Sequence, residues 1–108
     1  MNYSQINILV TGCFGVTARA IARSIKYSQK FCNSRLIGVD MGKNQFGLHE
    51  GLYQKCYKVP PAKNNLLYFE CIKKIIKNEG IDMAIVVPEL EVIEWCKEEL
   101  SLPVILPS

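Results

Sequence analysis

The stretch Met83–Val87 constrains the fold more than any other part of the sequence. It holds five apolar residues in a row and is followed at once by Pro88. An apolar run without alternation is typical of a strand that is buried on both faces, as strands of parallel sheets are. Pro88 has no amide hydrogen for the next ladder bond, so we expect the strand to end there. The stretch therefore predicts a parallel sheet covered on both sides.

The rest of the chain alternates predicted strands with predicted helices. The strands are expected at Ile6–Val10, Leu36–Val39, Cys56–Val59, Met83–Val87 and Pro103–Leu106. Apolar residues at helical spacing predict helices from Thr17 to about Gln29, across Tyr68–Ile76, and over Glu89–Leu100 with Ile93, Cys96 and Leu100 facing inward. Crossovers of this kind are right-handed, so we expect an α/β fold, a Rossmann-like three-layer αβα domain with a five-stranded parallel sheet in the order 3-2-1-4-5.

Three details refine this prediction. Lys58 interrupts the third strand, which is typical of a strand at the edge of a sheet. Asn64 or Asn65 is suited to cap the second helix, and Gly80 is suited to end it in a left-handed conformation. The link between the second and third strands lacks a clear helix, although residues 48–53 have the length for one short turn.

Size, charge and cysteine content limit the classes of protein. The 108 residues suffice for one domain, and no apolar run reaches the ~20 residues of a membrane span. The five cysteines form no C-x-x-C pair and the only histidine, His49, has no ligand residues at metal-binding spacing, so we expect no metal site and a cytoplasmic, reducing location. The net charge of +3 is spread along the chain, so we expect neither a nucleic-acid partner nor a membrane partner.

The predicted strand order places a candidate site between the first and fourth strands. Ligands of open α/β sheets bind at the carboxyl ends of the strands where the order reverses. The loop after the first strand is expected to supply backbone N–H groups, and Glu89 is expected to accept hydrogen bonds from a substrate. Glu91 and Glu94 are expected to point outward and to stabilise the helix dipole. The loop residues of this substrate-binding prediction are Gly12, Cys13, Phe14, Gly15 and Val16.

The same glycine loop allows other interpretations. Gly12 and Gly15, with Asp40 after the second strand, approach the fingerprint of an NAD(P)-binding domain of the short-chain dehydrogenase kind. Phe14 opposes this interpretation, because phosphate-binding loops keep small residues there, and no tyrosine is followed four residues later by lysine. Alternatively, the glycines serve packing alone and Asp40 caps the next turn.

Several segments together resemble the amino-terminal domain of ATP-grasp ligases, above all carbamoyl-phosphate synthase large-chain-like proteins. Ile85–Glu91 is also similar to the P-E-x-E segment of formate-dependent phosphoribosylglycinamide formyltransferases, with Glu89 at the substrate-contacting position, whereas Phe14 and Val16 depart from that subfamily. The other segments that carry the resemblance are Ile8–Gly12, Leu36–Met41, Tyr57–Pro60, Gly80–Asp82 and Pro103–Ser108.

The resemblance implies that residues 1–108 form a single pre-ATP-grasp domain, which binds the non-nucleotide substrate and has no catalytic residues of its own. It implies that ATP and Mg²⁺ are held by an ATP-grasp domain that is absent from this chain and acts in cis or in trans. The expected substrate is a small amino or carboxylic acid. Whether the chain forms a homodimer is left open. The alternatives are the NAD(P)-binding domain and a non-catalytic, flavodoxin-like interaction module.

Overall fold

The computed structural model describes residues 6–42 and 51–106, and they contain one five-stranded sheet. Its strands pair in the order β3-β2-β1-β4-β5, and all four pairings are parallel. The predicted strand order is therefore confirmed, as is the position of β3 at the edge. The strands are β1 (Asn7–Thr11), β2 (Arg35–Asp40), β3 (Lys55–Lys58), β4 (Met83–Ile85) and β5 (Val104–Ile105).

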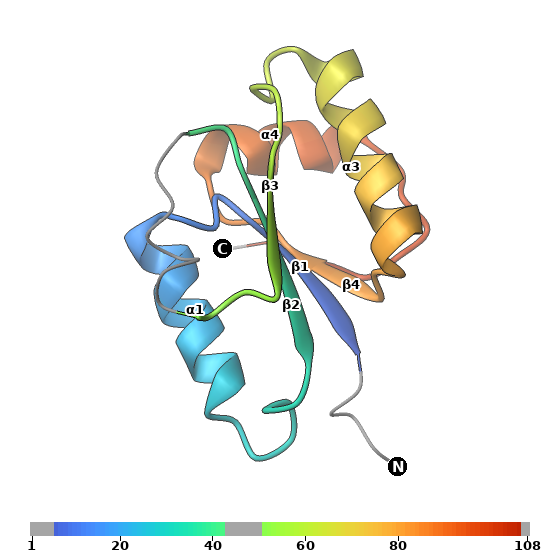
Figure 1. Cartoon of the computed structure of the whole chain (residues 1–108). Coiled ribbons are helices and arrows are strands. Elements are labelled where there is room, and N and C mark those ends of the chain that lie inside the picture. The colour runs from blue at the N-terminus through green and yellow to red at the C-terminus, as the bar shows by residue number, and fades with distance from the viewer. Residues whose placement is uncertain (1–5, 43–50, 107–108) are drawn as a thin grey trace.

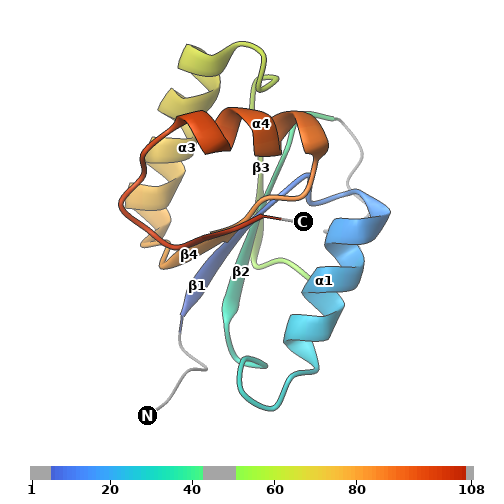
Figure 2. The same ribbon diagram turned by 180° about the vertical axis from the view of Figure 1, so that it is seen from behind.

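In the described part of the chain, three helices cover the two faces of the sheet. Helix α1 (Val16–Lys26) lies on one face, and α3 (Asn65–Glu79) and α4 (Glu89–Lys97) lie on the other (Figures 1 and 2). This three-layer arrangement confirms the predicted Rossmann-like α/β fold. Helix α4 crosses the sheet near the carboxyl ends of the strands, which is the end where the site was predicted (Figure 2).

The ends of the helices differ in places from the prediction. Helix α1 ends at Lys26 and α4 at Lys97, each about one turn early, and Glu98 already has an extended backbone. Helix α3 ends as predicted at Gly80, whose φ of 63° is left-handed, but its N-cap residue Asn64 makes no side-chain capping bond. His49 and residues 48–50 of the possible turn at 48–53 lie outside the described residues.

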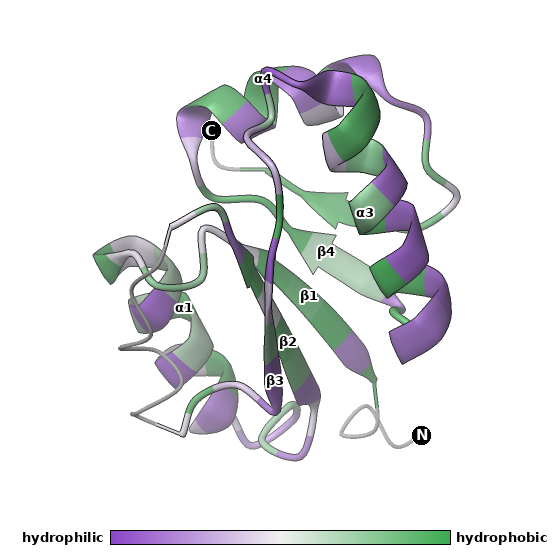
Figure 3. Ribbon diagram, turned by 45° about the horizontal axis from the view of Figure 1, so that its top comes forward, coloured by the Kyte–Doolittle hydropathy of each residue, from purple (hydrophilic) through white to green (hydrophobic). Residues whose placement is uncertain are grey.

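The sheet separates two apolar clusters. Leu9, Ile37 and Val39 face α3 and α4, whereas Ile8 and Val10 face α1. The ribbons of β1 and β4 are accordingly coloured mostly hydrophobic in Figure 3, while each helix alternates between polar and apolar stretches. Within the described part of the chain, no helix combines the length and apolar character needed to span a membrane. The two buried faces are what the unbroken apolar run in Met83–Val87 predicts.

Candidate functional site

The loop after β1 and the segment after β4 are in direct contact. Gly12 has a left-handed φ of 59°, and a Cβ atom added to it would lie 2.8 Å from the Cδ atom of Pro88 and closer still to its Cγ atom. Beside this contact, the amide of Val87 donates a hydrogen bond to the hydroxyl oxygen of Thr11 at 3.1 Å. The two segments of the predicted site therefore meet at the carboxyl edge of the sheet, where β1 and β4 are neighbours.

The first amides of the glycine loop have acceptors within the protein. Cys13 donates to the carbonyl oxygen of Val39 at 3.1 Å, and Gly15 donates to that of Gly12 at 2.9 Å. The Phe14 amide donates to Asp40 Oδ2 at 3.1 Å. These amides hold the loop in shape, so a ligand could reach them only by displacing internal bonds.

The amino end of α1 offers a different set of donors. Gly15 is the N-cap residue, and it makes no side-chain capping bond. The first amides of a helix have no acceptor within the helix and carry its positive dipole end. Gly15 and Val16 are exposed at this end, whereas Cys13 is completely buried. The exposed part of the predicted loop thus favours a negatively charged group.

Asp40 is part of the loop's own structure. Its Oδ2 atom accepts the Phe14 amide, and its Oδ1 atom accepts the Gly42 amide at 2.7 Å. The interpretation that Asp40 caps the turn after β2 is confirmed by the second bond. A ribose contact, which the NAD(P)-binding alternative requires, would compete with both amides for the same carboxylate.

One of the acids after β4 does not point where it was predicted to point. Glu89 is exposed, at the first position of α4. Glu91, which was expected to point outward, is only 1% exposed. Its Oε1 atom accepts a short hydrogen bond from the Tyr68 hydroxyl, which in turn accepts one from Trp95 Nε1 at 2.8 Å. The outward placement of Glu91 was therefore wrong.

The orientation of α4 explains this error. Ile93 and Cys96 were expected inward, but both are exposed, whereas Glu91 and Trp95 are buried against α3 and the sheet. Glu91 and Trp95 are four residues apart and so share one face of the helix. Taking Trp95 as the centre of the inward face would have placed Glu91 inward as well.

Burial changes the acidity of the Glu91 carboxyl. Removal from water raises its pKa above 4.5, the bond from Tyr68 lowers it in part, and the charge of Asp40 raises it further. Burial also raises the pKa of Tyr68, so its hydroxyl keeps its proton for the bond to Glu91. In the buried pair, the Tyr68 hydroxyl therefore stays protonated and donates to the Glu91 carboxyl, which loses its own proton only at a higher pH than an exposed glutamate does.

An apolar hollow lies beside α4 at the carboxyl ends of β2 and β3. It encloses about 360 Å³, and Lys63 and Glu94 bring opposite charges to it. Three of its apolar residues, Met41, Leu90 and Ile93, are each more than a third exposed. No motif in the sequence indicated this hollow, because its walls come from three separate segments. The lining residues are Met41, Pro61, Ala62, Lys63, Leu90, Ile93 and Glu94.

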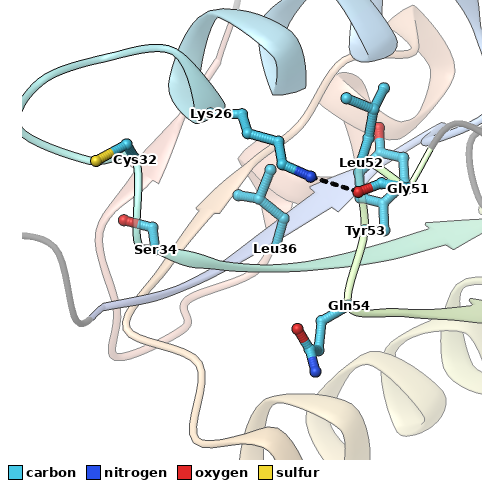
Figure 4. A pocket seen from close by; sticks show the side chains of 8 residues that line it. All are labelled: Lys26, Cys32, Ser34, Leu36, Gly51, Leu52, Tyr53 and Gln54. Carbon is cyan, nitrogen blue, oxygen red and sulfur yellow. Dashed lines mark hydrogen bonds between the residues drawn. The ribbon is translucent and has the colours of Figure 1, made fainter.

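A smaller hollow of about 140 Å³ lies at the opposite end of β2 (Figure 4). Lys26 reaches across it and donates a hydrogen bond to the carbonyl oxygen of Gly51 at 2.6 Å. Ser34 and Leu36, at the amino end of β2, also line it. It is therefore separate from the predicted site at the carboxyl edge of the sheet.

Neither the metal-site geometry nor the comparisons add an identification. Over residues 6–42 and 51–106, no group of three histidine, cysteine or acidic side chains is arranged to hold a metal ion. No protein-family model and no curated protein matches the chain. The geometry at the carboxyl edge and the sequence resemblance are therefore the two features that indicate a function.

Proposed function

We propose that this chain is the substrate-side domain of an ATP-dependent carboxylate–amine ligase of the ATP-grasp kind, inactive by itself. The observation that carries the proposal is the packing of Gly12 against Pro88. That contact brings the glycine loop and the P-E-x-E segment, two motifs of the resemblance, to one edge of the sheet. A family resemblance spread over distant segments gains support when the segments are neighbours in space.

The charges at this edge favour a small substrate with both an acidic and a donor group. The uncapped amino end of α1 suits a carboxylate, and Glu89, exposed at the start of α4, suits an amino or hydroxyl group. An amino acid or a related carboxylic acid has both. Gly15, Val16 and Glu89 are the residues of the predicted set that are exposed for this role, whereas Cys13 is buried and supports the loop.

ATP and Mg²⁺ belong, in this proposal, to an ATP-grasp domain supplied in cis or in trans. Phosphoryl transfer needs metal-bound carboxylates and groups that cover the phosphates. The hollow beside α4, with its exposed Met41, Leu90 and Ile93, is the surface we assign to contact with that domain. We also place the protein in a reducing cytoplasm, because the described cysteines are all free thiols.

We rank the NAD(P)-binding function second. The observation that favours it is the position of Asp40 beside the glycine loop at the end of β2. The loop amides of Cys13, Phe14 and Gly15, however, already have internal acceptors. A pyrophosphate would need these amides, so this function requires the loop to rearrange.

A thermal-shift screen distinguishes the two functions. The panel is NAD⁺, NADP⁺, ATP and a set of small amino and carboxylic acids. A ligand at ~100 times its Kd should stabilise the fold by ~2.7 kcal/mol. We expect a response to one class of acid, weakened in Glu89→Gln and kept in the matched variant Glu70→Gln, which alters an exposed acid on α3.

Two results would contradict the ligase proposal. A response to NAD⁺ or NADP⁺ alone would support the dehydrogenase-like function. No response to any compound, by the isolated chain or by the chain mixed with an ATP-grasp domain, would support an interaction module.

A further inference from the structure

Two cysteines from distant parts of the sequence lie side by side on the α1 face of the sheet. Gly38 in β2 has no side chain, and Cys13 fills the space: a Cβ atom at Gly38 would lie 2.7 Å from both Cβ and Sγ of Cys13. In the ladder, Gly38 is the direct partner of Cys56 in β3. Partners in neighbouring parallel strands direct their side chains to the same face. The Cys13 thiol therefore lies next to the Cys56 side chain.

Packing and hydrogen bonding support the same arrangement. Cys13 is fully buried, and Cys56 is partly buried against the same apolar cluster. The two thiols are near enough to change each other's acidity, which raises the pKa of Cys13 and lowers that of Cys56. The Tyr53 hydroxyl donates to the carbonyl oxygen of Cys13 at 2.8 Å, which fixes the backbone of the loop beside β3. The pair is thus held together by the fold in the reduced state.

We propose that Cys13 and Cys56 form a reversible disulfide when the protein meets a peroxide. The proposal is independent of the ligase function, since it rests on the packing of Cys13 against Gly38 and on the pairing of Gly38 with Cys56. Because Cys13 belongs to the glycine loop, the bridge would tie that loop covalently to the edge strand β3.

The chemistry assigns a different role to each thiol. The interaction with the neighbouring Cys13 thiol lowers the pKa of Cys56, while the same interaction and burial raise the pKa of Cys13. Cys56, the more accessible thiol, loses its proton, and its thiolate attacks one peroxide oxygen. The O–O bond breaks, the sulfur becomes a sulfenic acid, and the released hydroxide takes up the proton to give water.

Cys13 then completes the bridge. Its sulfur attacks the sulfenic sulfur, the S–O bond breaks, and the leaving hydroxide combines with the Cys13 proton as a second water. In total, two thiols are oxidised to one disulfide and one hydrogen peroxide is reduced to two waters. A dithiol such as dithiothreitol reverses the change by thiol–disulfide exchange.

The test uses the full chain with Cys32, Cys71 and Cys96 replaced by serine, so that only the proposed pair remains. Its matched control carries Cys56→Ser and keeps Cys71, which is also partly buried but packs in the cluster on the other face of the sheet. After one equivalent of hydrogen peroxide, we expect the first protein to lose two hydrogen atoms in its intact mass. A non-reduced digest should then show a peptide that joins Cys13 to Cys56 and disappears with dithiothreitol.

Rates and stability complete the test. We expect the bridge to form about tenfold or more faster in native protein than in urea, because the fold holds the reacting groups together. The oxidised protein should melt at a higher temperature than the reduced one, since the bridge restricts the unfolded chain. The proposal would be overturned if the bridge formed at the same rate in the test protein, which keeps Cys13 and Cys56, and in the control, which keeps Cys13 and Cys71. Sulfonic acid without a bridge, or a bridge that lowers the melting temperature, would overturn it too.

Discussion

The ring of Pro88 occupies the space that a side chain at Gly12 would need. Its Cδ atom would lie 2.8 Å from a Cβ atom at Gly12, and φ at Gly12 is 59°. The glycine is therefore required twice, by its backbone conformation and by the approach of the segment after β4. The contact joins the ends of two central strands, so it determines the shape of the candidate site.

Replacing Gly12 by alanine should destabilise the protein by about 3 kcal/mol. The left-handed conformation costs an alanine ~1–2 kcal/mol, and overpacking against Pro88 adds ~1–3 kcal/mol. Gly51→Ala is the matched control, because Gly51 has a φ of 69° but no described heavy atom within 4 Å of an added Cβ. Urea unfolding of both variants measures the difference. An equal loss in the two would show that Pro88 does not restrict the site.

Glu91→Gln should change how stability depends on pH. Burial raises the pKa of Glu91 above 4.5, so the unfolded chain ionises first as the pH rises. The free energy of unfolding should therefore fall between pH 4.5 and the raised pKa, by about 1.4 kcal/mol per unit of difference. Glutamine does not ionise and should remove this fall. Urea unfolding from pH 4 to 8 compares the proteins, with Glu70→Gln as a control that should follow the wild type.

Glu79→Gln should have the opposite pH dependence. The bond from Tyr57 and then the bond from Arg35 hold the pKa of Glu79 below 4.5, with a further contribution from Lys55 at 3.6 Å. The contribution of Glu79 to stability is therefore present above pH 4.5 and is lost as the pH falls through the lowered pKa.

We expect Glu79→Gln to be less stable than the wild type at pH 7 by about 1–2 kcal/mol, because hydrogen bonds to a charged group are lost. The two proteins should converge at low pH, where the wild-type carboxyl is also neutral. Thermal unfolding at pH 7 and pH 3 measures this. A difference that stays the same at both values would contradict a role for the charge.

Asp40→Asn should loosen the glycine loop. An asparagine has one carbonyl oxygen, so it cannot accept both the Phe14 amide and the Gly42 amide as the carboxylate does. We expect a loss of about 1 kcal/mol and faster hydrogen exchange at one of these amides. Asp82→Asn is the control: Asp82 Oδ2 accepts the Asn7 amide at 2.8 Å, at the other end of β1. Faster exchange at Phe14 in the control as well would contradict the assigned role.

Much of the architecture was predicted because it depends on local patterns. The run Met83–Val87, the stop at Pro88 and the left-handed Gly80 each reflect a property of the residues themselves. The structure confirms the strand and the helix end, but β4 ends at Ile85, so the prediction that the strand continues to Pro88 was wrong. The order of the strands followed from crossover handedness, which is a property of the backbone. The helix lengths were predicted less well. Helices α1 and α4 end about one turn earlier than their apolar patterns indicate, because the chain leaves the sheet at Lys26 and Lys97.

The sequence by itself determined that the chain folds as a parallel α/β sheet and that a glycine loop and an acidic segment end neighbouring strands. Only the tertiary structure decided which side chains face the interior. Glu91 is buried because Trp95 sets the rotation of α4, and Cys13 meets Cys56 because Gly38 leaves room between them. Residue patterns report contacts within one element, whereas these contacts depend on how separate elements pack, which distant residues control together.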